Sequence, residues 1–173
     1  MSDCVTLVRL EAEKKSLRLI EKIGPHLHTV QADSRRLRQI LLNLLNNAIK
    51  FTDAGEVGIS AKLLTADKQA HQVVFEVWDT GIGIAAADQK QVFKPFFQVE
   101  SGLGRHYGGA GLGLALVTEL TKIHDGTITI ESEVGDGSRF ILTLPNATTT
   151  DDQQNDHKRG TSMQVLDLSL IHI

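Results

Sequence analysis

The sequence has little cysteine, few aromatic residues and no long hydrophobic run. Only Cys4 is a cysteine among the 173 residues, so no disulfide can form within the chain. No apolar stretch approaches the roughly 20 residues of a membrane-spanning helix, and no signal-peptide pattern opens the chain. The formal net charge of −3 leaves no basic footprint for nucleic acid. We therefore expect a soluble cytoplasmic domain without nucleic-acid or direct membrane contact, even if its parent protein is membrane-anchored.

What the chain does contain is an orderly series of helix-like and strand-like patterns. Its length is enough for one domain with a real core. Periodicity and turn residues predict helices at 5–15, 34–51, 85–92 and 112–124, and strands at 16–23, 28–32, 56–64, 71–79, 127–131 and 138–144. We expect the strand at 28–32 to pair back onto the strand at 16–23. Asp33 or Ser34 is the expected N-cap of the long helix.

The segment after the strand at 73–78 places a carboxylate, Asp79, ahead of two glycines, Gly81 and Gly83. Glycine lets the backbone approach a ligand closely and adopt conformations that other residues resist. A carboxylate at an apolar strand end accepts hydrogen bonds, which suits the exocyclic amine of adenine. Taken alone, this pattern is more often an ordinary turn with aspartate as the turn former.

The long helix carries a second, polar face beside its apolar one. Asn43, Asn47 and Lys50 are four and three residues apart, and Gln39 lies four residues before Asn43. Buried or half-buried amides need partners, and a neighbouring element is the ordinary partner for each of them. Further along, Gly109-x-Gly111-x-Gly113 opens the helix at 112–124, where backbone N–H groups form a ready anion site.

These motifs, in this order and with Phe93-Lys94-Pro95-Phe96-Phe97 between them, resemble the ATP-binding catalytic domain of sensor histidine kinases. That family shares a superfamily with gyrase, the mismatch-repair ATPases and the ninety-kilodalton heat-shock chaperone. The resemblance runs from the first helix to Leu144. It implies a two-layer α/β sandwich: a mixed, mostly antiparallel sheet with helices packed on one face and a flexible ATP lid at 98–107.

The expected domain boundary follows the last strand. Residues 1–145 form the catalytic ATP-binding domain, and 146–173 read as a disordered linker or tail because their composition turns polar. The final hexapeptide also matches a reading frame of a common transposon-end sequencing adaptor. We therefore treat the extreme C-terminus as a candidate library artefact.

Site residues follow from the resemblance, position by position. The implied ATP-binding set is Asn43, Asn47, Lys50, Phe51, Asp79, Gly81, Gly83, Ile84, Gly109, Gly111, Leu112 and Gly113. Asn43 and Asn47 are the implied Mg²⁺ ligands and, together with Lys50, the catalytic set. Amide oxygens can complete a magnesium shell alongside water and phosphate. For Phe51 and Ile84, core packing is an equal interpretation.

Three positions depart from patterns common among relatives. Hydrolytic members place a glutamate four residues before the first Asn as a general base, and Gln39 cannot take that proton. Ala110 replaces a threonine, and Gln98 falls where many relatives carry an arginine near the γ-phosphate. Gln39 favours a kinase over a hydrolase. Ala110 and Gln98 keep open a non-catalytic nucleotide-sensing or interaction module. A serine kinase of the anti-sigma type is disfavoured by the Phe93–Phe97 segment and the longer lid.

No histidine in the sequence has the setting of a phosphoacceptor. The resemblance therefore implies that the acceptor lies on a separate dimerisation domain of the same or a partner kinase, with a response-regulator receiver downstream. The chain is expected to be the catalytic fragment of a larger sensor.

Overall fold

The computed structural model describes residues 1–25, 27, 29–67, 70–99, 110–146 and 164–167. In chain order the elements are α1 Ser2–Lys14, β1 Arg18–Ile23, β2 Thr29–Ala32, α2 Ser34–Lys50, β3 Glu56–Asp67, β4 Ala70–Asp79, α3 Gly113–Ile123, β5 Thr127–Glu133, β6 Gly137–Asn146 and β7 Gln164–Asp167. Within this described part, no helix combines the length and the apolar character needed to cross a membrane.

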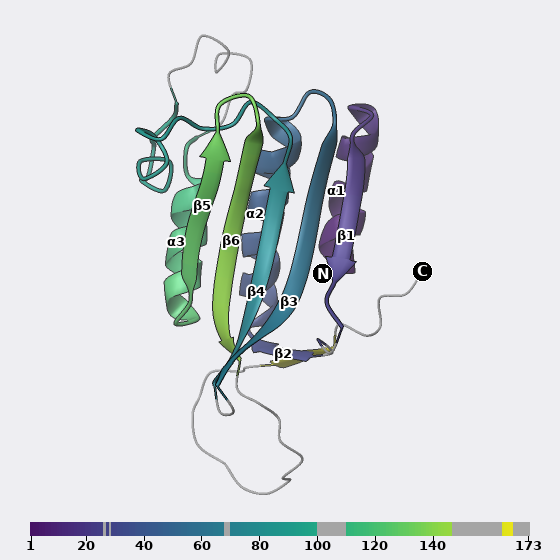
Figure 1. Ribbon diagram of the computed structural model, residues 1–173, viewed down its shortest axis with the longest axis vertical. Helices are drawn as coiled ribbons and strands as arrows, with labels where there is room; N and C mark the ends of the chain where they lie inside the picture. Colours follow the sequence, from purple (N-terminus) through teal and green to yellow (C-terminus); the bar gives the residue numbers. More distant parts are fainter. Residues whose placement is uncertain (26, 28, 68–69, 100–109, 147–163, 168–173) are drawn as a thin grey trace, which may run out of the picture.

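Five strands form one sheet in the order β1-β3-β4-β6-β5. β1 runs parallel to β3, whereas the remaining neighbours are antiparallel. All three helices lie against the same face of this sheet (Figure 1). The predicted two-layer sandwich with a mixed, mostly antiparallel sheet is therefore confirmed. The register sets Asp79, the last residue of β4, opposite Val57 of β3 and Ser138 of β6.

α2 is the central helix of the helical layer. Its N-cap is Asp33, whose side chain accepts hydrogen bonds from the backbone N–H groups of Arg35 (3.0 Å) and Arg36 (3.1 Å). The predicted apolar face is buried and consists of Leu37, Ile40, Leu41, Leu44, Leu45 and Ala48, and Ile49 is buried beside it. This face packs on the sheet, so the opposite polar face at Asn43, Asn47 and Lys50 is left for other contacts.

The predicted pairing of the strand at 28–32 with the strand at 16–23 is wrong. β1 pairs with β3, and β2 pairs antiparallel with β7 at the lower end of the sheet in Figure 1. Val30 and Ala32 are fully buried there. Burying these side chains at the end of the core thus stabilises the fold more than a hairpin across Gly24-Pro25 would. β7 also shows that residues 164–167, inside the predicted tail, form a strand.

The helix predicted at 85–92 is also absent. This segment forms consecutive turns, with isolated backbone bonds such as Gln89 N to Ala85 O at 3.2 Å and Val92 N to Asp88 O at 2.9 Å. A segment of eight residues gains too few hydrogen bonds to offset the cost of nucleating a helix. The last hairpin is confirmed, with β5 and β6 joined through the glycine-containing turn. Residues 100–107 of the predicted lid lie outside the described residues.

Candidate nucleotide-binding site

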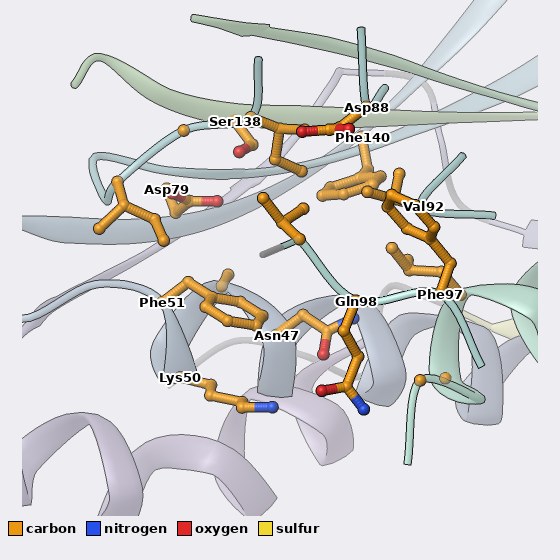
Figure 2. A pocket seen from close by; sticks show the side chains of 18 of the residues that line it. Asn47, Lys50, Phe51, Asp79, Asp88, Val92, Phe97, Gln98, Ser138 and Phe140 are labelled. Atoms are coloured by element: carbon orange, nitrogen blue, oxygen red, sulfur yellow. The ribbon is translucent and has the colours of Figure 1, made fainter. Parts of the chain in front are cut away.

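A cavity of about 510 Å³ opens between the C-terminal half of α2, the loop after β4, the start of α3 and the N-terminal end of β6 (Figure 2). This volume lies in the range of small-molecule and cofactor sites. Its lining residues are Asn47, Ala48, Lys50, Phe51, Asp79, Ile82, Gly83, Ile84, Ala85, Asp88, Val92, Phe97, Gln98, Val99, Ala110, Gly111, Leu112, Gly113, Leu114, Val134, Ser138 and Phe140. Apolar side chains dominate the walls, and the polar groups are few.

One end of the cavity contains the buried carboxylate of Asp79. Its side chain accepts a hydrogen bond of 2.9 Å from the N–H of Gly81, and only 7% of the residue is exposed. Burial raises the pKa of this carboxyl to about 6, while hydrogen bonds from the backbone of Gly81 and Ser138 act in the opposite direction. A buried acceptor of this kind is suited to an amine donor on a flat apolar base.

The loop after Asp79 is fixed by backbone contacts. The N–H of Ile82 donates to the carbonyl of Phe51 at 3.2 Å, and the carbonyl of Ile82 accepts from Gly135 at 2.9 Å. Gly83 has a φ of +69°, and a Cβ there would overlap the carbonyl oxygen of Glu133. Only glycine fits this position, because both the left-handed backbone and the closeness of the β5–β6 hairpin exclude a side chain.

Ser132 and Gln89 connect the same loop to the hairpin. The N–H of Ile84 donates to the Ser132 hydroxyl at 2.8 Å, and that hydroxyl donates to the carbonyl of Gly137 at 2.7 Å. The Gln89 amide donates to the carbonyls of Ile84 (3.1 Å) and Ser132 (2.7 Å). Both polar groups of the Ile84 backbone are therefore satisfied by side chains that hold it at the cavity wall.

The opposite end of the cavity contains the polar face of α2. Figure 2 shows Asn47 and Lys50 on the side of the cavity away from Asp79. The Lys50 ammonium lies 4.7 Å from the centre of the Phe51 ring, and burial lowers the pKa of this lysine. A desolvated ammonium gains most from an anionic partner, so Lys50 is placed to meet a negatively charged ligand.

Asn43 lies one helical turn before Asn47 and faces the start of α3. A Cβ placed on Gly113 would lie 3.3 Å from the Asn43 Oδ1 and 3.9 Å from the Asn47 Nδ2. Gly113 is the first residue of α3, and no side chain caps this helix start. Its first N–H groups therefore join the two amides in a polar corner that suits anions.

Most of the predicted ATP-binding residues come together in this cavity. Nine of them line it: Asn47, Lys50, Phe51, Asp79, Gly83, Ile84, Gly111, Leu112 and Gly113. Asn43 and Gly81 are not lining residues but adjoin them, next to Gly113 and Asp79 respectively. Gly109 lies outside the described residues. The predicted roles of these residues in holding a nucleotide stay predictions.

The sequence did not predict the part of the cavity wall that comes from β6 and from residues 85–92. Ser138 and Phe140 line the cavity because they alternate with outward residues along β6, next to Asp79. The alternation is visible in the sequence. It does not identify these residues as part of the site, however, until the pairing of β6 with β4 is known. Of the aromatic segment, Phe97 lines the cavity, Phe93 packs edge-on against Phe140 at 6.3 Å, and Phe96 is 74% exposed.

Within the described ranges, no group of three His, Cys, Asp or Glu side chains stands close enough to hold a metal ion. A cation here would depend on amide oxygens, water and ligand oxygens. Mg²⁺ accepts that donor set, since it usually retains several waters and binds phosphate oxygens. The side-chain amides of Asn43 and Asn47, which lie beside the start of α3, fit this donor set for Mg²⁺.

Comparison with known proteins agrees with this geometry. Residues 32–148 match the family described as histidine kinase-, DNA gyrase B-, and HSP90-like ATPase, and the chain belongs to this family. Relatives and solved structures narrow the class further. The chain is an ATP-binding catalytic domain of the sensor histidine kinase type.

Among curated relatives, the circadian input-output histidine kinase CikA of Synechococcus elongatus is 47% identical over 119 residues, which cover 68% of this chain and 15% of CikA. The autoinducer 2 sensor kinase/phosphatase LuxQ of Vibrio cholerae is 47% identical over 116 residues, covering 67% of this chain and 13% of LuxQ. The chain thus spans only a small part of the length of these relatives.

Two solved structures show the same fold. Full-length ShkA in complex with AMPPNP superimposes with a TM-score of 0.75 at 35% identity, covering 86% of this chain and 29% of that one. The nucleotide-free catalytic domain of the histidine kinase ThkA gives a TM-score of 0.69 at 26% identity, covering 84% of this chain and 90% of that one. ThkA is therefore matched over nearly its whole catalytic domain.

Proposed function

We propose that this domain binds Mg·ATP in the cavity and transfers the γ-phosphoryl group to a histidine on a separate dimerisation domain. The observation that carries the proposal is the polarity of the cavity: a buried carboxylate at one end, and amides, an ammonium and a helix start at the other. An adenine amine suits the first end and a triphosphate suits the second. In the reaction, an imidazole nitrogen forms a bond to phosphorus as the bond to the ADP oxygen breaks.

Each predicted site residue that the structure describes has a role in this proposal. Asp79 accepts the adenine amine, with Gly81 and Gly83 allowing close approach beneath the base. Lys50 contacts phosphate oxygens as a point charge, and the N–H groups at the start of α3 do the same. Asn43 and Asn47 would hold Mg²⁺, whose chemistry is to neutralise developing charge on the phosphates. Phe51, Ile84, Gly111, Leu112 and Gly113 complete the walls.

Gln39 favours transfer over hydrolysis. Its side chain is exposed, and its backbone carbonyl accepts a 2.9 Å hydrogen bond from the Asn43 amide. A glutamine in place of the general base of hydrolytic relatives cannot activate water. Positioning and charge neutralisation then keep the phosphoryl group for an acceptor. A response-regulator receiver would be the next acceptor, and a cytoplasmic location would suit such a relay.

A second candidate function is nucleotide sensing without transfer. Gln98 and Ala110 both line the cavity, so neither position adds charge or a hydroxyl there. A site of that kind would bind ATP and signal by a change in shape or partner. Adding an acceptor domain separates the two functions, because only the kinase would form phosphohistidine.

The first experiment measures Mg·ATP binding by calorimetry for the wild-type chain, the Asp79→Asn variant and the Asp136→Asn variant. Asp136 is exposed in the β5–β6 turn and serves as the control. We expect micromolar-to-millimolar binding, lost in Asp79→Asn, retained in Asp136→Asn, and accompanied by little ADP release. Radiolabelled phosphate is then followed onto a histidine-containing dimerisation domain. Steady ATP turnover by the chain alone would favour a hydrolase, and absence of binding by the folded chain would contradict the proposal.

A further inference from the structure

We propose that Lys15 is a positioning residue of the nucleotide site, although it does not line the cavity. It neutralises the C-terminal end of α2 and so allows phosphate groups to bind beside Lys50. This inference rests on the proposed function, because it assumes that the polar end of the cavity receives the phosphates.

The Lys15 ammonium binds three backbone carbonyls at the end of α2. It donates to Ile49 O at 3.0 Å, Lys50 O at 2.9 Å and Thr52 O at 3.0 Å. The carboxylate of Asp53 lies 3.6 Å away. An ammonium has three N–H donors in a compact head, so it matches these three oxygens in number. The Lys15 nitrogen thus makes all three hydrogen bonds to residues that lie 34 to 37 positions further along the sequence.

The fourth carbonyl of this stretch is also occupied. Phe51 O accepts a hydrogen bond of 3.2 Å from the N–H of Ile82 in the glycine loop. Carbonyls at a helix end lack partners within the helix and usually face water. Here the four carbonyls from residue 49 to residue 52 are all engaged by other parts of the protein. The last turn of α2 is thus held between the end of α1 and the loop that follows Asp79.

The direction of the Lys15 side chain is fixed by the end of α1. Lys15 is the C-cap of that helix, and Ser16 adopts a φ of +56°. The N–H of Leu17 then returns to Ala12 O at 2.9 Å, which turns the chain away from the helix axis. The neighbouring Lys14 has no such role, because its ammonium pairs with exposed Glu11 on the same helix.

The electrostatic consequence concerns phosphate binding. A helix C-terminus carries a partial negative charge of roughly half an elementary charge. Lys50, the last residue of α2, is the cation proposed to contact the phosphates. A ligand with several negative charges would therefore approach a helix end that is itself partially negative. Lys15 places a positive charge directly on this end, and the exposed Asp53 carboxylate 3.6 Å away offsets part of it. Lys15 should therefore matter more for a highly charged ligand than for an uncharged one.

The experiment compares Mg·ATP with adenosine as probes, by nuclear magnetic resonance titration of Lys15→Met and of the matched control Lys14→Met. All variants are titrated at a temperature where circular dichroism shows them folded. We expect Lys15→Met to weaken ATP binding about three- to tenfold while adenosine binding changes less than about twofold. Lys14→Met should leave both affinities unchanged. Lys15→Arg, which keeps the charge, should retain most of the preference for ATP.

Two results would overturn the inference. Equal weakening of ATP and adenosine would mean that Lys15 only supports the fold, and unchanged ATP affinity would mean that the end of α2 does not influence the phosphates. If Lys15→Met does not fold, Lys15→Gln is used, since it keeps hydrogen-bond donors but has no charge. Failure of the wild-type chain to bind ATP would instead contradict the proposed function, so the two failures are distinguishable.

Discussion

The two ends of the cavity are built in different ways. The end at Asp79 is made of backbone that the end of α2, the β5–β6 turn and β5 hold in place, through Phe51, Gly135 and Ser132 respectively. The end at Lys50 is made of side chains from one helical face that meet the start of α3. The difference indicates that recognition of a base depends on a fixed shape. Recognition of phosphates depends on charges that can adjust to the ligand.

This contrast predicts that backbone changes at the Asp79 end affect folding, whereas charge changes at the Lys50 end affect mainly binding. Lys15 lies at the meeting point of the two, because the end of α2 that it caps also receives the hydrogen bond from Ile82. The variants below test the contrast at the Asp79 end, from the largest expected effect to the smallest.

Gly83→Ala should be the most damaging change. The new Cβ would overlap Glu133 O, and the φ of +69° adds the cost of a left-handed alanine. We expect the free energy of unfolding to fall by about 3 kcal/mol or more in urea titrations. Gly135→Ala is the control, since its φ is +92° but no atom lies within 4 Å of the new Cβ. It should cost only about 1 kcal/mol. Equal losses would mean that backbone strain, and not the packed hairpin, sets the requirement.

Asp79→Asn should separate stability from binding. The folded pKa of about 6 lies above the ordinary value of 3.8, so the folded state binds the proton more tightly than the unfolded state. The ionised carboxylate therefore costs stability above pH 6, and this cost disappears as the pH falls toward 4. At pH 8 we expect the variant to be more stable by about 1 to 3 kcal/mol while it loses ATP binding.

The measurement is urea unfolding of wild type and variant at pH 8 and pH 4. The difference between them should be present at pH 8 and nearly absent at pH 4. A variant that is less stable than wild type at pH 8 would show that the hydrogen bonds to Asp79 outweigh its burial. The carboxylate would then be part of the structural support of the loop.

The sequence predicted those features that depend on residues close together in the chain. The polar face of α2 follows from the spacing of Asn43, Asn47 and Lys50, and the N-cap of the same helix from Asp33. The side-chain supports from distant elements could not be predicted in this way. Ser138 lines the cavity, Ser132 supports its wall, and Lys15 contacts the end of α2, in each case only because strand register or helix packing brings the residue there.

The two errors had different origins. Proximity in the sequence predicts that the strand at 28–32 pairs with the strand at 16–23, but the buried side chains of β2 belong at the end of the core, where β7 pairs with it. The segment 85–92 has helical spacing but too few residues to form a helix by itself. Tertiary packing decided the first case, and the length of the segment decided the second.

Ser132→Ala has the smallest expected effect. It removes one side-chain hydrogen-bond partner from the Asp79 end of the cavity, which is otherwise held by backbone contacts. The substitution leaves the Ile84 N–H and the Gly137 carbonyl without the hydroxyl that satisfies both. We expect a loss of about 1 kcal/mol in stability and about fivefold weaker adenosine binding, because Ile84 lines the cavity. Thr129→Ala, at an exposed position of the same strand, is the control for the loss of a β5 hydroxyl. A stability loss without weaker adenosine binding would mean that Gln89 alone positions the Ile84 backbone.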